Sequence, residues 1–282
     1  MRRFLLFRNP VFGRFWGARI VSYLGSAATV AVLPLYVYET QGDPISVGIL
    51  TLAMTLPRLL GPFAGTVSDR MDGKRLMILC DLGQAAMIGL AALLLPPFPV
   101  LVLLVAGSAT LSTLFFPAGR SAVPALVAPD DLTPANAFLG TAANLGFALG
   151  PALGGSAFAV IGARGALAFD AVTFLVSAAF LASLPALPSA PKDGAALSAG
   201  FLAEVRDGLR YVSHQPLVRA LVVGLFFGIT FIAVDTVALV FLARGPLETG
   251  GAGYGLLASA HGVGMILGPL LLLRRVRLAL VP

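Results

Sequence analysis

Two ionisable side chains, Asp235 and His261, lie inside long apolar segments, where burying a charge is costly. Asp235 stands about 8 residues before the end of segment 217–243, and His261 about 8 residues after the start of segment 253–273. At 1.5 Å per residue each is about 12 Å deep, so the two can meet if the helices pack together. A carboxylate beside an imidazole at low dielectric is suited to proton coupling near neutral pH. The alternative is a structural hydrogen bond across a helix pair.

Two further polar residues, Arg58 and Asn144, are candidates for a substrate cavity. Arg58 lies about 18 Å deep in segment 45–67 and follows Pro57, which favours a kink. An arginine at this depth can attract an anionic group of a substrate, or it can pair with an acidic residue and only fix packing. Asn144 can line a cavity or form a hydrogen bond between helices.

The remaining charged residues of the apolar segments are weaker candidates for a functional site. We expect Asp170 near the outer membrane surface, in an interfacial role. We expect Asp81 and Arg19 close to the inner surface, where each can reach water or the other.

Signatures of enzymatic chemistry are missing from the sequence. It has no paired carboxylates at catalytic spacing, no metal-ligand cluster, no nucleophile elbow and no phosphate-binding loop. The single cysteine, Cys80, excludes a disulfide within the chain. We therefore expect no enzyme, no catalytic residue, no cofactor and no metal site.

The composition indicates a membrane protein. The chain is 58% hydrophobic and 11% charged, with a mean hydropathy of +0.93, whereas soluble domains carry about 25% charged residues. Its net charge of +6 comes from short basic loops and does not indicate nucleic-acid binding. Apolar runs predict eight transmembrane helices, at about 15–38, 45–67, 76–95, 98–116, 135–160, 165–187, 217–243 and 253–273.

The fifth of these runs carries a glycine motif, Gly146-Phe-Ala-Leu-Gly150-Pro151-Ala-Leu-Gly154-Gly155. Glycines four residues apart form one smooth stripe along a helix, which lets a neighbouring helix approach closely. Pro151 removes a backbone donor and favours a kink. Plain helix packing is the alternative reading of this stripe.

The connection between the second and third runs is short and charged: Gly65-Thr-Val-Ser-Asp69-Arg70-Met-Asp-Gly-Lys74-Arg75. A charged cluster in so tight a turn can form ion pairs at the inner mouth of a helix bundle. Topology alone is the alternative, since inner loops tend to be basic.

Both motifs resemble those of the major facilitator superfamily. The glycine motif matches the fifth-helix motif of its exporters, which is associated with proton antiport. Gly65, Asp69, Arg70 and Lys74 match its loop signature, although Asp72 and Gly73 depart from it. In the family this loop latches the inner gate, and the resemblance assigns that role to Asp69 and Arg70. The likeness is closest to exporters of siderophores and macrolide-type drugs.

The resemblance implies an all-α bundle with about 8 of the family's usual 12 helices. We expect a six-helix half over 1–187, a cytoplasmic linker over 188–216 and two helices of the second half over 217–282. An amphipathic helix is expected between Phe201 and Val212. Because four family helices are missing, we expect either a truncated chain or a partner chain that supplies them.

Orientation follows from the distribution of Lys and Arg. With the N-terminus inside, only Arg164 and Arg244 lie outside, while Arg19 and Arg58 lie within segments. Both termini are therefore expected to be cytoplasmic, in the plasma membrane. The inner residues are Arg2, Arg3, Arg8, Arg14, Arg70, Lys74, Arg75, Arg120, Lys192, Arg206, Arg210, Arg219, Arg274, Arg275 and Arg277.

Two functions remain open at this point. The resemblance implies a secondary transporter that exports a drug-like or siderophore-like small molecule by proton antiport and alternating access. The alternative is a transport-incompetent remnant or a membrane scaffold. The expected partners are lipid, the substrate and protons, without nucleic acid.

Overall fold

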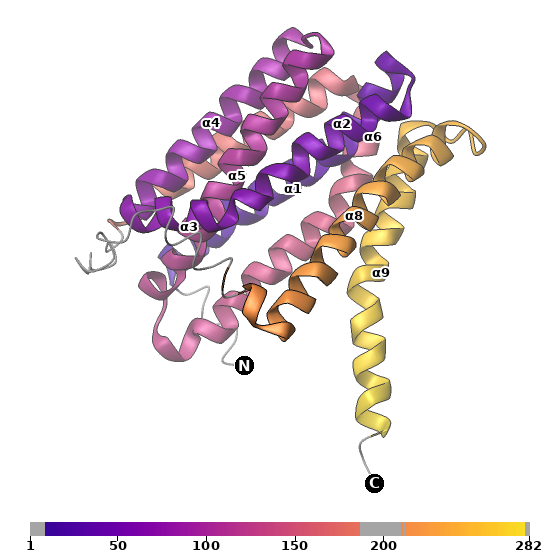
Figure 1. Ribbon diagram of the computed structural model, residues 1–282. Coiled ribbons are helices and arrows are strands. Elements are labelled where there is room, and N and C mark those ends of the chain that lie inside the picture. The colour runs from indigo at the N-terminus through magenta and orange to yellow at the C-terminus, as the bar shows by residue number, and fades with distance from the viewer. Residues whose placement is uncertain (1–8, 187–209, 211, 280–282) are drawn as a thin grey trace.

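The computed structural model describes residues 9–186, 210 and 212–279, and all regular structure in these ranges is helical (Figure 1). This confirms the all-α class. Four helices of the described residues are long and apolar enough to cross a membrane, or five if one bent pair is a single span. The expected linker helix between 201 and 212 lies almost wholly outside the described residues.

Helix α1 (Pro10–Gln41) begins and ends with local signals that the sequence contains. The side chain of Asn9 accepts hydrogen bonds from the backbone N–H groups of Val11 and Phe12, which supplies partners at an open helix start. Gly42 ends the helix with φ 74°, a left-handed conformation that favours glycine. The chain then turns sharply into α2.

The second apolar run forms a broken helix. It consists of α2 (Pro44–Thr55), the 3₁₀ turn η2 (Leu56–Leu60) and α3 (Gly61–Arg70), with a bend of 58° at the break. Pro57 lies in the 3₁₀ turn and has no N–H to continue the α-helical ladder. The break therefore falls where the sequence places this proline.

Helices α4 (Gly73–Leu94) and α5 (Phe98–Leu126) form an antiparallel pair joined by Leu95–Pro97. Helix α5 extends well beyond the expected end at residue 116, and it contains Pro117, Arg120 and Pro124. A short 3₁₀ turn, η3 (Pro129–Asp131), leads into α6.

Helix α6 (Leu132–Ala182) joins the fifth and sixth expected segments into one long element with two limbs. The change of direction is at Gly162, with φ 69° and ψ −179°. Gly162 lies in the gap between the two expected segments, which end at 160 and begin at 165, and the helix continues through Pro151 with helical dihedral angles. The second limb packs against α1 and α4.

Helices α8 (Pro216–Arg244) and α9 (Gly250–Ala279) form a pair beside α1, α2 and α6, and the C-terminal part of α9 projects away from the other helices (Figure 1). Two hydrophobic clusters fill the interior. One includes Val240, Ala243 and Tyr254 from this pair. The other, around Phe12, Met77 and Leu181, contains no described residue of α8 or α9.

Candidate functional site

The two ends of the bundle differ in how α8 and α9 contact the rest. We call one the Arg244 end, which holds the connections 42–43, 95–97 and 245–249 and the bend at Gly162. The opposite one, the Lys74 end, holds the turn between α3 and α4 and the end of α6 at Ala182.

At the Arg244 end, α8 is joined to α1 by charged and aromatic contacts. Arg244 forms an ion pair with Glu39, and its guanidinium lies 5.9 Å from the ring centre of Phe158 on α6. Tyr38 meets Phe241 edge to face, with ring centres 4.8 Å apart. The sequence did not predict the Glu39–Arg244 pair, because these residues are 205 positions apart and their meeting depends on how the helices pack.

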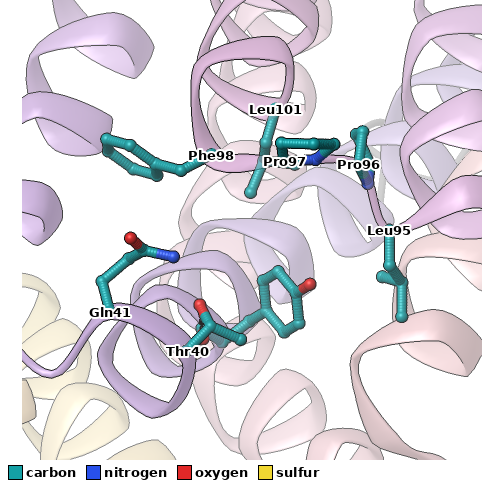
Figure 2. A pocket seen from close by; sticks show the side chains of 8 residues that line it. Thr40, Gln41, Leu95, Pro96, Pro97, Phe98 and Leu101 are labelled. Atoms are coloured by element: carbon teal, nitrogen blue, oxygen red, sulfur yellow. Dashed lines mark hydrogen bonds between the residues drawn. The ribbon is translucent and has the colours of Figure 1, made fainter.

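Two cavities open at the same end. The larger, about 620 Å³, is lined by Tyr36, Glu39, Phe158, Arg164 and Arg244 among others. The smaller, about 310 Å³, lies between the end of α1 and the start of α5, where Thr40 and Gln41 stand opposite Pro97 and Phe98 (Figure 2).

The glycine motif on the first limb of α6 lies where other helices come closest. A Cβ atom at Gly146 would stand 3.1 Å from the backbone oxygen of Tyr23, and one at Gly150 or Gly154 would overlap Ala27 or Ala28 of α1. These residues therefore hold α1 against α6, as expected for a small-residue stripe.

Gly155 and Pro151 of the same motif face α9 instead. A Cβ atom at Gly255 of α9 would lie 2.6 Å from the carbonyl oxygen of Pro151, and one at Gly155 would overlap Gly251. The N–H of Ala152 donates a hydrogen bond to Ser259 Oγ at 2.9 Å. One motif thus contacts both α1 and α9.

Asp235 of α8 and His261 of α9 lie together. Their Oδ2 and Nδ1 atoms are 3.3 Å apart, and their side chains are 44% and 46% exposed. The pairing agrees with the depth argument, while proton coupling itself stays a prediction.

Arg58 and Asn144 are not brought together. Arg58 lies in the 3₁₀ break between α2 and α3, and Asn144 lies on the first limb of α6; both are exposed. Neither forms a hydrogen bond or an ion pair within the described ranges. A shared substrate cavity formed by this pair stays a prediction.

The charged turn at the Lys74 end is held by its basic residue. Lys74 Nζ donates to the carbonyl oxygens of Ala182, at 2.9 Å, and of Leu184, so a positive charge lies at the C-terminal end of α6. Asp72 caps α4 by accepting from the N–H of Arg75 at 2.8 Å.

The other members of this turn are less constrained. Gly65 lies on α3 with open space around it, and Asp69 and Arg70 are exposed. Across the described residues, neither Asp69 nor Arg70 has a hydrogen bond or an ion pair.

One expectation about acidic residues is wrong and another holds in part. Asp170 is not interfacial: it is 1% exposed and lies between α6 and α1. Asp81 is 0% exposed and does not reach water, but it interacts electrostatically with Arg19, the other partner expected for it. The Arg19 guanidinium also lies 4.3 Å from the ring centres of Tyr23 and Phe115. Long apolar runs conceal such burial, because lipid-facing and core-facing positions are equally apolar.

Residues for metal binding are not grouped in the described part of the chain. It contains no cluster of three or more His, Cys, Asp or Glu side chains. Cys80 is a buried free thiol. The arrangement thus offers helix contacts, one half-exposed acid–imidazole pair and buried carboxyl groups.

Comparison with known proteins places these features in context. The sequence matches the family described as "Transmembrane secretion effector" over residues 3–280. The multidrug efflux pump Tap of Mycolicibacterium fortuitum is 28% identical over 73% of this chain and 53% of its own length. Macrolide efflux protein A of Streptococcus pyogenes is 24% identical over 79% of this chain and 56% of its own length. The chain spans about half the length of these curated relatives.

A solved structure shares the fold. It is a bacterial homologue of the human lysosomal transporter Spinster, in an inward-facing and unoccupied conformation. The match has a TM-score of 0.69 and 18% sequence identity, and it covers 94% of this chain and 62% of that one.

Proposed function

The chain belongs to the transmembrane secretion effector family of major facilitator transporters, and we propose that it exports a small organic molecule across the plasma membrane. The family match over residues 3–280 carries this proposal. Membership in this family confirms the resemblance that the motifs indicated. It also identifies a multi-pass membrane protein of a transporter class, which is not enzymatic.

The substrate we propose is a drug-like or siderophore-like molecule. The relatives named for multidrug and macrolide efflux support this class. The larger cavity at the Arg244 end is of the size that holds small ligands, about 300–1,000 Å³, and it carries both charged and aromatic lining. Arg58 and Asn144 are proposed to face the substrate path further along the bundle.

Transport is proposed to proceed by alternating access. The α8–α9 pair contacts the first six segments through Glu39–Arg244, Tyr38–Phe241 and the glycines around Gly155. All of these contacts lie toward the Arg244 end of the bundle. Contacts confined in this way let the two parts rock about them. We propose that Asp69 and Arg70 latch the opposite end when the Arg244 end opens, with Lys74 anchoring their turn to α6.

Proton antiport is proposed to use Asp235 and His261. The carboxylate of Asp235 lies 3.3 Å from the imidazole of His261, and both side chains are half-exposed. We propose that the Lys74 end and both termini face the cytoplasm, which follows the positive-inside rule. Protons would then enter from the Arg244 end as substrate leaves.

Inverted membrane vesicles test these proposals. Vesicles with an acidic interior should accumulate a macrolide or a fluorescent drug when they contain this protein. Asp235→Asn should abolish gradient-driven accumulation, whereas the matched control Glu248→Gln, an exposed acid in the 245–249 connection, should retain it. Equal accumulation by Asp235→Asn and wild type would refute proton coupling through this pair.

A second candidate function is a scaffold, or a transport-incompetent remnant, that needs a partner chain to supply further helices. It is favoured by the exposed apolar side chains along α8, among them Leu217, Phe226 and Phe231, which are 73%, 60% and 73% exposed. Light scattering on the purified protein distinguishes the two readings. A stable complex with another chain, together with no accumulation in vesicles, would favour the scaffold.

A further inference from the structure

A carboxyl group is buried within the first six segments, away from the Asp235–His261 pair. Asp170 lies on the second limb of α6 and is 1% exposed. Its Oδ2 atom is 2.6 Å from Thr29 Oγ1 of α1. A Cβ atom at Gly25 would stand 2.5 Å from Asp170 Oδ1, so the backbone of α1 lies directly against the carboxyl group.

Hydrogen-bond donors for a charged Asp170 are scarce. Thr173 Oγ1 lies 3.2 Å from Asp170 Oδ1, but its single hydroxyl proton has a shorter acceptor, the backbone oxygen of Asp170 at 2.7 Å. Among the described residues, Thr29 alone remains as a full donor. A buried carboxylate without a cation and with a single good donor is strongly disfavoured.

Charged groups on the surrounding helices do not compensate for this. Arg19 and Tyr23 lie on α1, and Cys80 and Asp81 lie on α4. None of them forms a hydrogen bond or an ion pair with Asp170 in the described ranges. The Arg19 guanidinium lies against the rings of Tyr23 and Phe115.

We propose that Asp170 is a proton-binding site, in which Thr29 Oγ1 donates to Oδ2 and the carboxylic acid O–H on Oδ1 donates to Thr173 Oγ1. The neutral acid satisfies the 2.6 Å contact and leaves no buried charge. Release of the proton leaves a carboxylate that needs water or a cation. Because Gly25 closes the site, α1 and the second limb of α6 must separate to admit either.

This site is mechanically linked to the glycine motif through α1. The turn of α1 that contacts Asp170, with Gly25 and Thr29, also contains Ala27 and Ala28, which press on Gly150 and Gly154. A shift of α1 on proton release would therefore change its contact with the first limb of α6. A role of this shift in transport rests on the proposed function, whereas proton occupancy of Asp170 does not.

Infrared spectroscopy of the purified chain in lipid tests the occupancy. Wild type at neutral pH should show the C=O stretch of a hydrogen-bonded carboxylic acid. Asp170→Asn should lose that band, and Asp81→Asn, which alters the other buried acid, should retain it. Thr29→Val keeps the carboxyl group and should shift the band to higher frequency, because its hydrogen bond is lost.

Circular dichroism and monodisperse elution establish that each variant is folded. A spectrum in which Asp170→Asn changes no acid band, or in which Thr29→Val leaves the band in place, overturns the proposal. These readouts need no transport, so failure of vesicle accumulation bears on the proposed function alone.

Discussion

Asp170 and Asp235 are both acids within apolar helices, yet their surroundings are opposite. Asp170 is enclosed between α1 and α6 with hydroxyl partners and without a paired cation in the described part of the chain, whereas Asp235 is half-exposed beside an imidazole. The contrast reflects two regions: α1 to α6 pack along their length, while α8 and α9 contact them mainly toward the Arg244 end. A packed region suits stable binding of a proton, whereas the described helices leave the Asp235–His261 pair only partly enclosed.

The largest expected effect comes from disrupting the close packing between α1 and α6. Gly154→Leu places a side chain where Ala28 of α1 already lies, and overpacking of this kind costs about 3 kcal/mol. We expect a marked fall in the thermal unfolding midpoint in detergent. Gly140→Leu is the matched control, since nothing lies within 4 Å of a Cβ atom at Gly140 on the same helix. Similar midpoints for both variants would contradict close packing at the motif.

The next effect concerns the attachment of α8. Arg244→Glu places like charges at Glu39, and we expect a loss of about 1 kcal/mol in the free energy of unfolding. The double variant Glu39→Arg with Arg244→Glu should recover most of it. Chemical denaturation of the single and double variants measures the coupling. No recovery in the double variant would argue against a direct pair.

A smaller effect sharpens the contrast between the two acids. Asp235→Asn should change the free energy of unfolding by less than about 0.5 kcal/mol, because the pair is half-exposed. Asp170→Leu, which leaves the hydroxyl of Thr29 without its partner, should cost about 1–3 kcal/mol. Thermal scans of the two variants side by side give the ranking, and a reversed order would overturn the comparison.

The smallest effect is a pH dependence at the start of α2. The backbone N–H of Ser46 donates to Asp43 and holds the pKa of this half-buried carboxyl below its usual value. Its stabilising contribution is therefore present above the unfolded pKa of about 4 and is lost as the pH falls through the folded value.

Asp43→Ala tests this cap. The variant should unfold earlier than wild type at pH 6, and the difference should vanish in acid. Asp43→Ser is the control, because serine also caps a helix without titrating in this range. A difference between wild type and Asp43→Ala that persists unchanged in strong acid would contradict the assignment.

Several features of the fold followed from the sequence because they depend on local chemistry. Apolar runs located the helices, Pro57 located the break in the second run, and Asp235 and His261 met as their depths implied. The family motifs correctly indicated a major facilitator transporter.

Other features depend on packing that no local pattern records. The burial of Asp170 and Asp81, the Glu39–Arg244 pair and the extension of α5 past Pro117 each require a neighbouring helix to be in place. The hydrogen bond beside Pro151 is a further example, because the N–H of Ala152 donates to Ser259 Oγ of α9.

The central claim is that the contact at the Arg244 end opens and closes during export. The double variant Glu39→Cys with Arg244→Cys places one thiol on each side of this contact, and efflux in vesicles can be measured before and after a cleavable bifunctional thiol reagent joins them. We predict that the cross-link stops drug accumulation and that its reductive cleavage restores it, with each single-cysteine variant unaffected by the reagent. Undiminished accumulation by fully cross-linked protein would contradict the account.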